Sequence, residues 1–260
     1  MPLFIERPAV AAPGFHIGTS SWTNLAWGHG VLPADVPAGS RLAYLARHLN
    51  SVEINSTFYR VPTPHMVARW VDAVGPDFRF SVKVNREITH ERRLRDCRKP
   101  LDEFAGAVSG FGRKAGAMLI QLPPSFRPGW RDLERFLHVF HTIPDAAMWR
   151  PVVELRNRAW PVEETKNMLD ENHCALCVSD AATYPTSAPN SRGPVYVRRH
   201  GTVGMYRGGY SPGQLAADAA ALRPFVNAGR DVYVYFNNTI DHHAYANALA
   251  LRDLTSAVHT

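Results

Sequence analysis

The chain has 260 residues, of which 45% are hydrophobic and 20% are charged, and these proportions exclude a disordered or fibrous protein. No apolar run approaches the roughly 20 residues that a membrane span requires, so we expect no membrane association. Lysine and arginine total 29 against 23 acidic residues, and the net charge of +6 favours an anionic partner.

The first residues and the cysteines predict a cytoplasmic protein. Residues 1–14 contain Glu6, Arg7 and three prolines, whereas a signal peptide has a basic start and a long apolar stretch. Three cysteines, an odd number, argue against a disulfide framework and favour a reducing compartment. We expect an N-terminal extension over 1–14, a single domain over 15–255 and a C-terminal tail over 256–260.

Short β-branched or aromatic runs alternate with amphipathic segments along the chain. The clearest helical pattern spans Asp132–His141, where apolar residues recur at the i, i+3, i+4 and i+7 positions. The predicted strands are 15–20, 52–55, 78–84, 117–122, 152–156, 175–180, 195–200 and 232–237, and the predicted helices are 41–49, 65–74, 101–111, 132–141, 162–172, 212–227 and 242–254. Eight strands alternating with helices at this length predict an α/β fold, a single (β/α)8 TIM barrel.

One unit of this barrel is irregular. Only about fourteen residues, Ala181–Pro194, separate the sixth and seventh strands, and they are rich in Pro, Ser and Asn. We therefore predict that the helix between these strands is missing. A doubly wound sheet is the alternative fold, but no GxGxxG follows a strand, so a dinucleotide cofactor has no support.

Polar residues end seven of the predicted strands in one phase. Side chains two residues apart point to the same face of a strand, and a barrel interior is expected to hold apolar layers below an active site at the strand C-termini. The pairs in this phase are Glu53 with Asn55, Ser81 with Lys83, Leu119 with Gln121, Glu154 with Arg156, Val178 with Asp180, Arg198 with His200, and Tyr235 with Asn237. This convergence predicts a ligand site at the mouth of the barrel, although a single charged strand end is often only solvated.

Seven motifs in matching order resemble a known family. They are GTSSWTNLAW (18–27), VEINSTFYRVP (52–62), FSVKVNREITHERRL (80–94), LIQLPPSF (119–126), VELRNRAW (153–160), VYVRRHG (195–201) and VYVYFNNTIDHHAYANALAL (232–251). Together they resemble the DUF72 (YecE-like) family, which implies a TIM barrel but no established reaction. A distant likeness of this family to phosphate-ester-cleaving barrels such as endonuclease IV is an analogy of fold. The sequence departs from the family at Asn24 and over Tyr184–Arg192.

Three cations at the predicted strand ends point to an anionic ligand. Lys83, Arg156 and Arg198 suit a phosphate or carboxylate, because arginine offers a planar fork of donors and lysine a compact charge. Alternatively, these cations pair internally, Glu154 with Arg156 or Lys83 and Asp180 with Arg198. Further candidate ligand contacts are Asn55, Gln121, Asn237, His90, Trp22, Tyr59 and Trp160. Each of these aromatic rings also has an alternative role in loop packing.

The same strand ends supply candidates for proton transfer. Glu154 or Glu53 is the expected general base, His200 the expected acid, and Asp180 a further catalytic candidate. A histidine at a strand end is also often a hydrogen-bonded structural residue. The four side chains could in principle ligate a divalent metal, but nearby cations would repel the ion. We therefore predict no cofactor and assign no metal ligand, with a divalent metal as the alternative.

The CxxC spacing of Cys174 and Cys177 has a structural interpretation. A redox CxxC opens a helix, whereas this one starts a predicted strand, which turns the two thiols to opposite faces. We expect two buried structural cysteines.

Three functional hypotheses follow. The first is an enzyme acting on a phosphate-bearing substrate, such as a phosphate-ester hydrolase, that uses the cationic rim. The second is a nucleic-acid-binding module that uses the basic segment 86–99, which we otherwise interpret as a solvated loop. The third is a sugar or sugar-phosphate isomerase, with Tyr184–Arg192 as its lid. The sequence does not indicate an oligomeric state.

Overall fold

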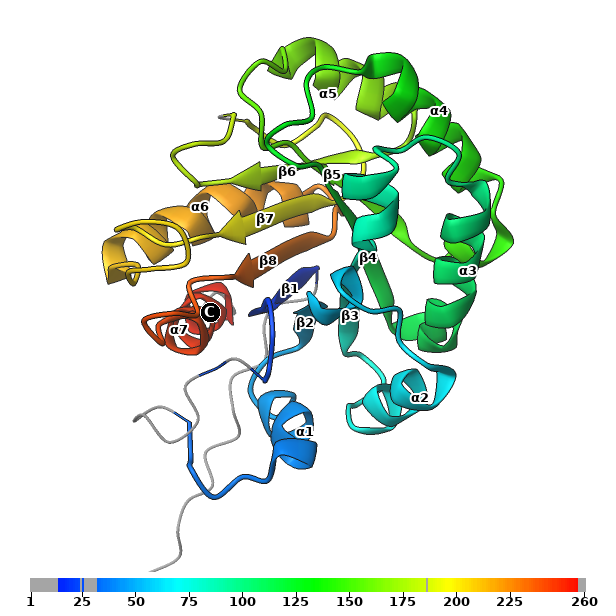
Figure 1. Cartoon of the computed structure of the whole chain (residues 1–260). Helices are drawn as coiled ribbons and strands as arrows, with labels where there is room; N and C mark the ends of the chain where they lie inside the picture. Colours follow the sequence, from blue (N-terminus) through cyan, green and yellow to red (C-terminus); the bar gives the residue numbers. More distant parts are fainter. Residues whose placement is uncertain (1–13, 24, 26–31, 186, 257–260) are drawn as a thin grey trace, which may run out of the picture.

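The computed structural model describes residues 14–23, 25, 32–185 and 187–256. Eight parallel strands form a closed barrel in chain order, with the last strand paired to the first (Figure 1). They are β1 (Phe15–Thr19), β2 (Ser51–Ile54), β3 (Arg79–Lys83), β4 (Ala115–Gln121), β5 (Arg150–Glu154), β6 (Ala175–Ser179), β7 (Val195–Arg199) and β8 (Val232–Phe236). The predicted (β/α)8 barrel is confirmed.

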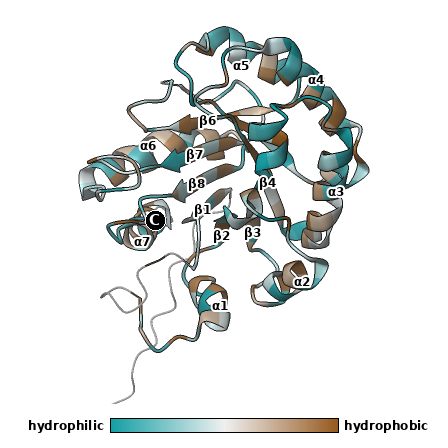
Figure 2. Ribbon diagram, in the orientation of Figure 1, coloured by the Kyte–Doolittle hydropathy of each residue, from teal (hydrophilic) through white to brown (hydrophobic). Residues whose placement is uncertain are grey.

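Helices surround the strands and cover them with one apolar side. They are α1 (Arg41–Leu45), α2 (Pro64–Asp72), α3 (Arg98–Val108), α4 (Trp130–His141), α5 (Val162–Glu171), α6 (Pro212–Asn227) and α7 (Ala244–Ser256). The predicted stripe of α4 is buried at Leu133, Phe136, Leu137 and Phe140. Figure 2 shows the resulting mixture of hydrophobic and hydrophilic residues on the helices.

The connection between β6 and β7 contains no helix in its described residues, as predicted. Asn190 holds this connection against the barrel. Its Oδ1 accepts from the Leu176 amide at 2.5 Å, and its Nδ2 donates to the Cys174 carbonyl at 3.2 Å. A buried side-chain amide thus anchors this connection to backbone groups at the start of β6.

The barrel interior is more polar than expected. Tyr196, Tyr233 and Tyr235 fill its width, and the Tyr235 hydroxyl lies 2.5 Å from Ser51 Oγ and 2.9 Å from Ser81 Oγ. The expectation of purely apolar layers is therefore wrong. Tyrosine supplies the volume that the interior needs, and its hydroxyl is tolerated there because it forms hydrogen bonds.

The two cysteines of the CxxC pattern face opposite sides of the barrel wall. Cys174 packs in the outer core, between strands and helices, whereas Cys177 packs in the barrel interior. Burial raises the pKa of both thiols, which keeps them protonated and unreactive at neutral pH. This confirms the prediction of buried structural cysteines.

The predicted N-terminal extension (1–14) and C-terminal tail (256–260) lie almost entirely outside the described residues. Within the described part, no helix is long and apolar enough to cross a membrane.

Candidate functional site at the carboxyl ends of the strands

A cavity of about 640 Å³ opens at the carboxyl ends of the strands. Its walls come from the loops that follow β1, β2 and β8 and from side chains at the ends of β3, β5 and β7. The described lining residues are Ser20, Ser21, Trp22, Thr23, Ile54, Asn55, Ser56, Tyr59, Met66, Trp70, Lys83, Arg156, Arg198, Tyr206, Asn237 and Thr239. Five of the candidate polar contacts are among them: Asn55, Lys83, Arg156, Arg198 and Asn237.

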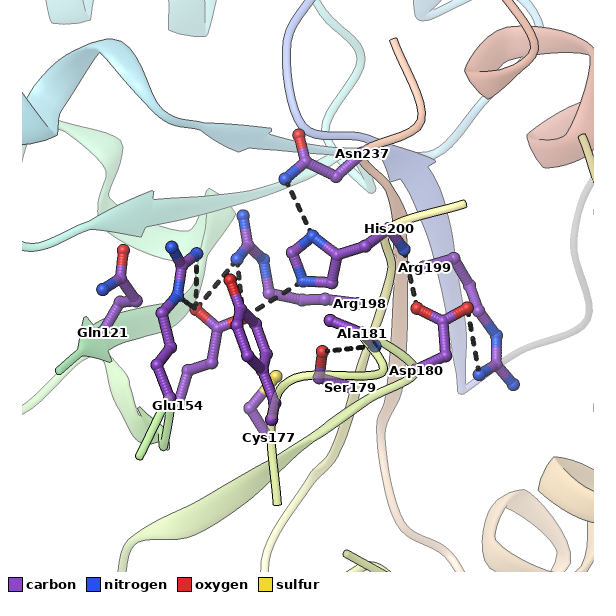
Figure 3. Close-up of polar contacts among 12 residues, drawn as sticks. Gln121, Glu154, Cys177, Ser179, Asp180, Ala181, Arg198, Arg199, His200 and Asn237 are labelled. Carbon is purple, nitrogen blue, oxygen red and sulfur yellow. Dashed lines mark hydrogen bonds and ion pairs between the residues drawn. The ribbon is translucent and has the colours of Figure 1, made fainter. Parts of the chain in front are cut away.

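The phase expected for β6 is wrong. Cys177 faces the barrel interior, and Val178 packs against the outer core, so Asp180 points outward. Its carboxylate accepts from the His200 backbone amide at 2.8 Å and from the Tyr210 hydroxyl, and it lies 3.9 Å from Arg199. Figure 3 shows Asp180 beside Arg199 and away from Glu154. Asp180 therefore holds the start of the loop after β7 instead of facing the cavity.

Arg198 lies between two fully buried carboxylates beneath the cavity. Its Nε and Nη2 donate to Glu53 at 2.9–3.3 Å, and its Nη1 donates to both Glu154 oxygens at 2.9 Å. Burial alone would raise the pKa of each carboxyl, but the Arg198 charge lowers both. Hydrogen bonds from Arg198 and Tyr196 add to this lowering at Glu53. The Arg156 charge and a hydrogen bond with His200 add to it at Glu154. Internal pairing thus exists, and the expected partner of Arg198, Asp180, is replaced by Glu53.

Glu53 and Glu154 have their remaining contacts inside the protein as well. The Tyr196 hydroxyl donates to Glu53 at 2.6 Å, and Arg156 donates to Glu154 through Nε at 3.3 Å and Nη2 at 3.2 Å. Neither carboxylate is among the described residues that line the cavity. Arginine holds each carboxylate as an anion and away from the cavity wall. A role in proton transfer therefore stays a prediction for both.

His200 connects this charge cluster to the cavity wall. Its Nε2 lies 3.2 Å from Glu154 Oε1 and its Nδ1 lies 3.4 Å from Asn237 Nδ2 (Figure 3). The Nδ2 group of Asn237 can only donate, so His200 Nδ1 is the acceptor and His200 Nε2–H donates to Glu154. Burial lowers the pKa of His200. The imidazole is therefore neutral at neutral pH, and both of its nitrogens are engaged.

Among the described cations of the site, Lys83 is the one that forms no ion pair with a described acidic residue. The residue is 9% exposed, its Nζ lies 4.0 Å from the centroid of the Phe58 ring, and it forms no hydrogen bond with a described residue. Burial lowers the pKa of Lys83 to about 7, with further lowering by the charges of Arg198 and Arg156. An ammonium group enclosed in this way is poised to lose its proton or to take up an anion.

His90 and Gln121 lie next to the cavity but do not line it. A π-helical turn, Glu87–Glu91, places His90 Nε2 at 3.4 Å from Gln121 Nε2, which also donates to the Leu122 carbonyl at 2.9 Å. Burial, followed by the charges of Lys83 and Arg156, lowers the pKa of His90 to about 4. His90 also packs edge-to-face on the Phe58 ring, at 4.8 Å between centroids, and this ring lies against Lys83 Nζ.

The aromatic candidates divide into two groups. Trp22, which packs edge-to-face on Trp70 at 5.5 Å, and Tyr59, which is 72% exposed, both line the cavity. Trp160 does not line the cavity, so the structure does not bring it together with these candidates. It is 2% exposed, stacks on Phe126 and donates through Nε1 to the Phe126 carbonyl at 3.1 Å, so it closes the loop after β5.

Two lining residues, Met66 and Trp70, come from α2 and were missed by sequence reasoning. Their spacing reads as an ordinary amphipathic helix, because apolar residues that cover a core and those that form a cavity wall have the same periodicity. The polar strand ends and the aromatic residues Trp22 and Tyr59 were the signals for this site in the sequence.

The basic segment 86–99 is largely neutralised by local acidic residues. Arg86 pairs with Glu91 at 3.0 Å, Arg92 with Glu87 at 2.8 Å, and Arg95 with Asp132 at 2.8 Å, all on the surface. Arg93 donates instead to Ser125.

The four side chains weighed as metal ligands do not share one coordination site. Asp180 points away from Glu154, and the carboxylates of Glu53 and Glu154 are taken by Arg198. Among the residues that the structure describes, no group of three or more His, Cys, Asp or Glu side chains is arranged to hold a metal ion.

Comparison with known proteins identifies the family. The family described as "Protein of unknown function DUF72" matches residues 16–260. The UPF0759 protein YecE of Escherichia coli K12 is 34% identical over 130 residues, which cover 50% of this chain and 44% of that protein. The match thus spans less than half the length of this curated relative.

Two solved structures share the fold over nearly their whole length. A DUF72 family protein from Thermotoga maritima MSB8 has a TM-score of 0.80 at 23% identity and covers 92% of this chain and 98% of its own. A second, from Enterococcus faecalis V583, has a TM-score of 0.75 at 22% identity and covers 95% and 97%. With the family match over residues 16–260, the chain belongs to the DUF72 family.

Proposed function

We propose that this protein is an enzyme that acts on a phosphate-bearing small molecule held at the mouth of the barrel. The observation that carries the proposal is the charge of the site. Among the described residues, three cations, Lys83, Arg156 and Arg198, face two carboxylates, Glu53 and Glu154, and the positive charge without an ion pair is on the lysine at the cavity wall. A bound anion would complete the pairing that a buried charge requires.

Arg156 provides the directional part of this anion site. Its Nε and Nη2 are used by Glu154, which leaves Nη1 without a hydrogen bond to any described residue. The guanidinium carbon lies 4.9 Å from the centroid of the Tyr184 ring, which holds the group in place. A preoriented guanidinium beside an ammonium suits the oxygens of a phosphate.

The size of the cavity favours a small molecule over nucleic acid. About 640 Å³ lies within the range of small-ligand sites, and Trp22, Tyr59 and Trp70 supply apolar walls. The segment 86–99, which the nucleic-acid hypothesis depends on, has three of its arginines paired with acidic neighbours. A polyanion would have to compete with these pairs for each contact.

The neutral polar groups of the lining favour a sugar phosphate, the kind of substrate on which isomerase-type chemistry acts, over a phosphate ester without free hydroxyl groups. Both isomerisation and hydrolysis need a group that moves a proton, and Lys83 is a candidate for it at the cavity wall. The described lining residues include no carboxylate or imidazole, whereas Asn55, Asn237 and Thr239 offer neutral donors and acceptors that suit hydroxyl groups.

Ligand-dependent thermal stability tests the proposal. We expect sugar phosphates and inorganic phosphate to stabilise the protein, by about 2.7 kcal/mol at a concentration 100 times the Kd. Arg156→Gln should reduce this response at the same ligand concentration to about 1.4 kcal/mol or less, as a tenfold loss of affinity requires, and Arg92→Gln, which removes an exposed paired arginine, should leave it unchanged. Stabilisation by DNA but by no phosphorylated small molecule, or a response that is as large in Arg156→Gln as in the unchanged protein, would refute the proposal.

A further inference from the structure

Lys83 is the described lining residue whose uncharged form is a strong nucleophile near neutral pH. The cavity wall has no aspartate, glutamate, histidine or cysteine among its described residues. Serine and threonine hydroxyls are present there, but a hydroxyl nucleophile needs an adjacent base to activate it. An amine that has lost its proton needs no such partner.

We propose that the Lys83 amine forms an imine with the carbonyl carbon of a phosphorylated hydroxy-aldehyde or hydroxy-ketone bound in the cavity. This inference rests on the proposed function, because Arg156 holds the phosphate of the same molecule. It adds a covalent step and narrows the substrate to a sugar phosphate that carries a free carbonyl group.

The surroundings of Lys83 fix the amine and leave it open on one side. The residue ends β3, and its carbonyl accepts a hydrogen bond from the Thr57 hydroxyl at 2.7 Å, which anchors the backbone. The Phe58 ring packs beneath Nζ at 4.0 Å, and the free side of the side chain lines the cavity. No carboxylate forms an ion pair with Nζ among the described residues, so deprotonation breaks no salt bridge.

The neighbouring charges favour the neutral amine before the substrate reacts. Burial, Arg198 and Arg156 together lower the pKa of Lys83 to about 7, against the opposing charges of Glu154 and Glu53. A lysine beside other cations in a partly apolar pocket is activated in this way. A substantial fraction of Lys83 is therefore uncharged at neutral pH.

The covalent step balances without an added reagent. The Nζ lone pair attacks the carbonyl carbon, the C=O π bond breaks as the C–N bond forms, and one proton moves from the nitrogen to the oxygen to give a neutral carbinolamine. A second proton, taken up from the solvent, lets this oxygen leave as water, and a protonated imine remains. The positive charge on the imine nitrogen restores the cation that the two buried carboxylates and the bound phosphate require, and it withdraws electrons from the neighbouring carbon atom.

Asn55 offers a hydrogen-bond acceptor for a substrate hydroxyl group next to the reacting carbonyl. Its Nδ2 donates to the Ser20 carbonyl at 3.0 Å, whereas its Oδ1 is buried and has no hydrogen-bond partner among the described residues. Asn55 lines the cavity close to the strand end that carries Lys83. A buried unpaired acceptor calls for a donor, and the hydroxyl of a hydroxy-carbonyl compound supplies one.

Reductive trapping tests the inference on the full-length protein. Dihydroxyacetone phosphate is added at neutral pH, and sodium borohydride reduces any imine to a stable amine. Mass spectrometry then measures the mass of the intact protein and of its peptides after digestion. We expect one adduct with the mass of the substrate less one oxygen atom, located on Lys83. The chain has three other lysines, and Lys99, with a side chain 87% exposed, reports on non-specific reaction.

The outcomes separate this inference from the proposed function. In one outcome, phosphate stabilises the protein in a way that depends on Arg156, while neither dihydroxyacetone phosphate nor glyceraldehyde 3-phosphate forms an adduct on Lys83. That result overturns the proposed imine and is consistent with the proposed function. An adduct that forms equally well with dihydroxyacetone supports the imine and refutes the phosphate site. An adduct spread over Lys83 and Lys99 alike overturns the imine. With both proposals correct, the phosphorylated probe reacts roughly tenfold faster, and Lys83→Arg forms no adduct.

Discussion

Two regions of this protein are rich in positive charge, and they differ in how that charge is paired. In the segment 86–99, Arg86, Arg92 and Arg95 each lie within 3.0 Å of an acidic side chain on the surface. At the mouth of the barrel, Arg198 is buried between two carboxylates, while Lys83 pairs with no described acidic residue. A count of basic residues along the sequence would favour the segment 86–99 over the mouth of the barrel as the anion-binding region.

The comparison shows that pairing and burial decide what a charge can do. Exposed ion pairs contribute about 0–1 kcal/mol each and are screened by salt. Buried charges are not solvated by water, so removing the partner of one lowers the stability of the fold. A buried charge that has no partner favours the binding of an oppositely charged ligand. Four predictions follow from this difference.

The largest effect is expected from Arg198→Met. This change leaves Glu53 and Glu154 buried without their main partner, so the free energy of unfolding should fall by about 3–5 kcal/mol. Denaturant unfolding measures this loss, with Arg92→Met as the surface control. Adding Glu53→Gln to Arg198→Met should restore part of the stability, and no recovery would contradict the assignment of the loss to unpaired charge.

Arg156→Gln should affect ligand binding more than stability. Glu154 keeps Arg198 and His200 as partners, so we expect the unfolding free energy to fall by about 1 kcal/mol. The affinity for sulfate or phosphate should fall about tenfold or more, because a charge-assisted contact is lost. Calorimetric titration gives the affinity, and an unchanged Kd would remove Arg156 from the anion site.

Sulfate binding should weaken as the pH rises from 6 to 8. The pKa of Lys83 in the free protein is about 7, so the ammonium that attracts the anion is present below this pH and is lost above it. The bound anion favours the protonated form, so binding is coupled to proton uptake. Sulfate keeps its charge over this range, and the slope should disappear in Lys83→Met. His90 contributes little to it, because its pKa is already lowered to about 4.

The smallest effect is expected from Arg92→Gln combined with Arg95→Gln. Both side chains are exposed and locally paired, so the unfolding free energy should change by less than about 1 kcal/mol. Sulfate affinity should not change. A steep loss of binding to short DNA in this double variant would instead support a nucleic-acid role for the segment, and gel-shift titration at several salt concentrations measures it.

The site was predictable as far as strand alternation could be followed. Glu53, Arg156 and Arg198 follow the phase that their strands predict, because each strand holds a polar residue two positions from another polar or small one. The phase of β6 could not be read from its sequence. Ala175, Cys177 and Val178 are all small or apolar, so either face could be interior, and the conspicuous charge of Asp180 suggested the wrong one.

Trp160 shows a second limit of the sequence. A tryptophan after a strand can face a ligand or close a loop, and a large ring with one hydrogen-bond donor fits both positions. The choice depended on the Phe126 ring and carbonyl, which come from the preceding unit of the barrel.

The sequence by itself determined the barrel, its missing helix and the edge where the site forms, because periodicity and strand direction are local properties of the chain. The tertiary structure alone decided which charges meet. Glu53 and Arg198 are 145 positions apart, and only barrel closure brings them within 2.9 Å. The same closure leaves Lys83 buried without an acidic partner among the described residues. This burial of an unpaired cation is what favours the binding of an anion.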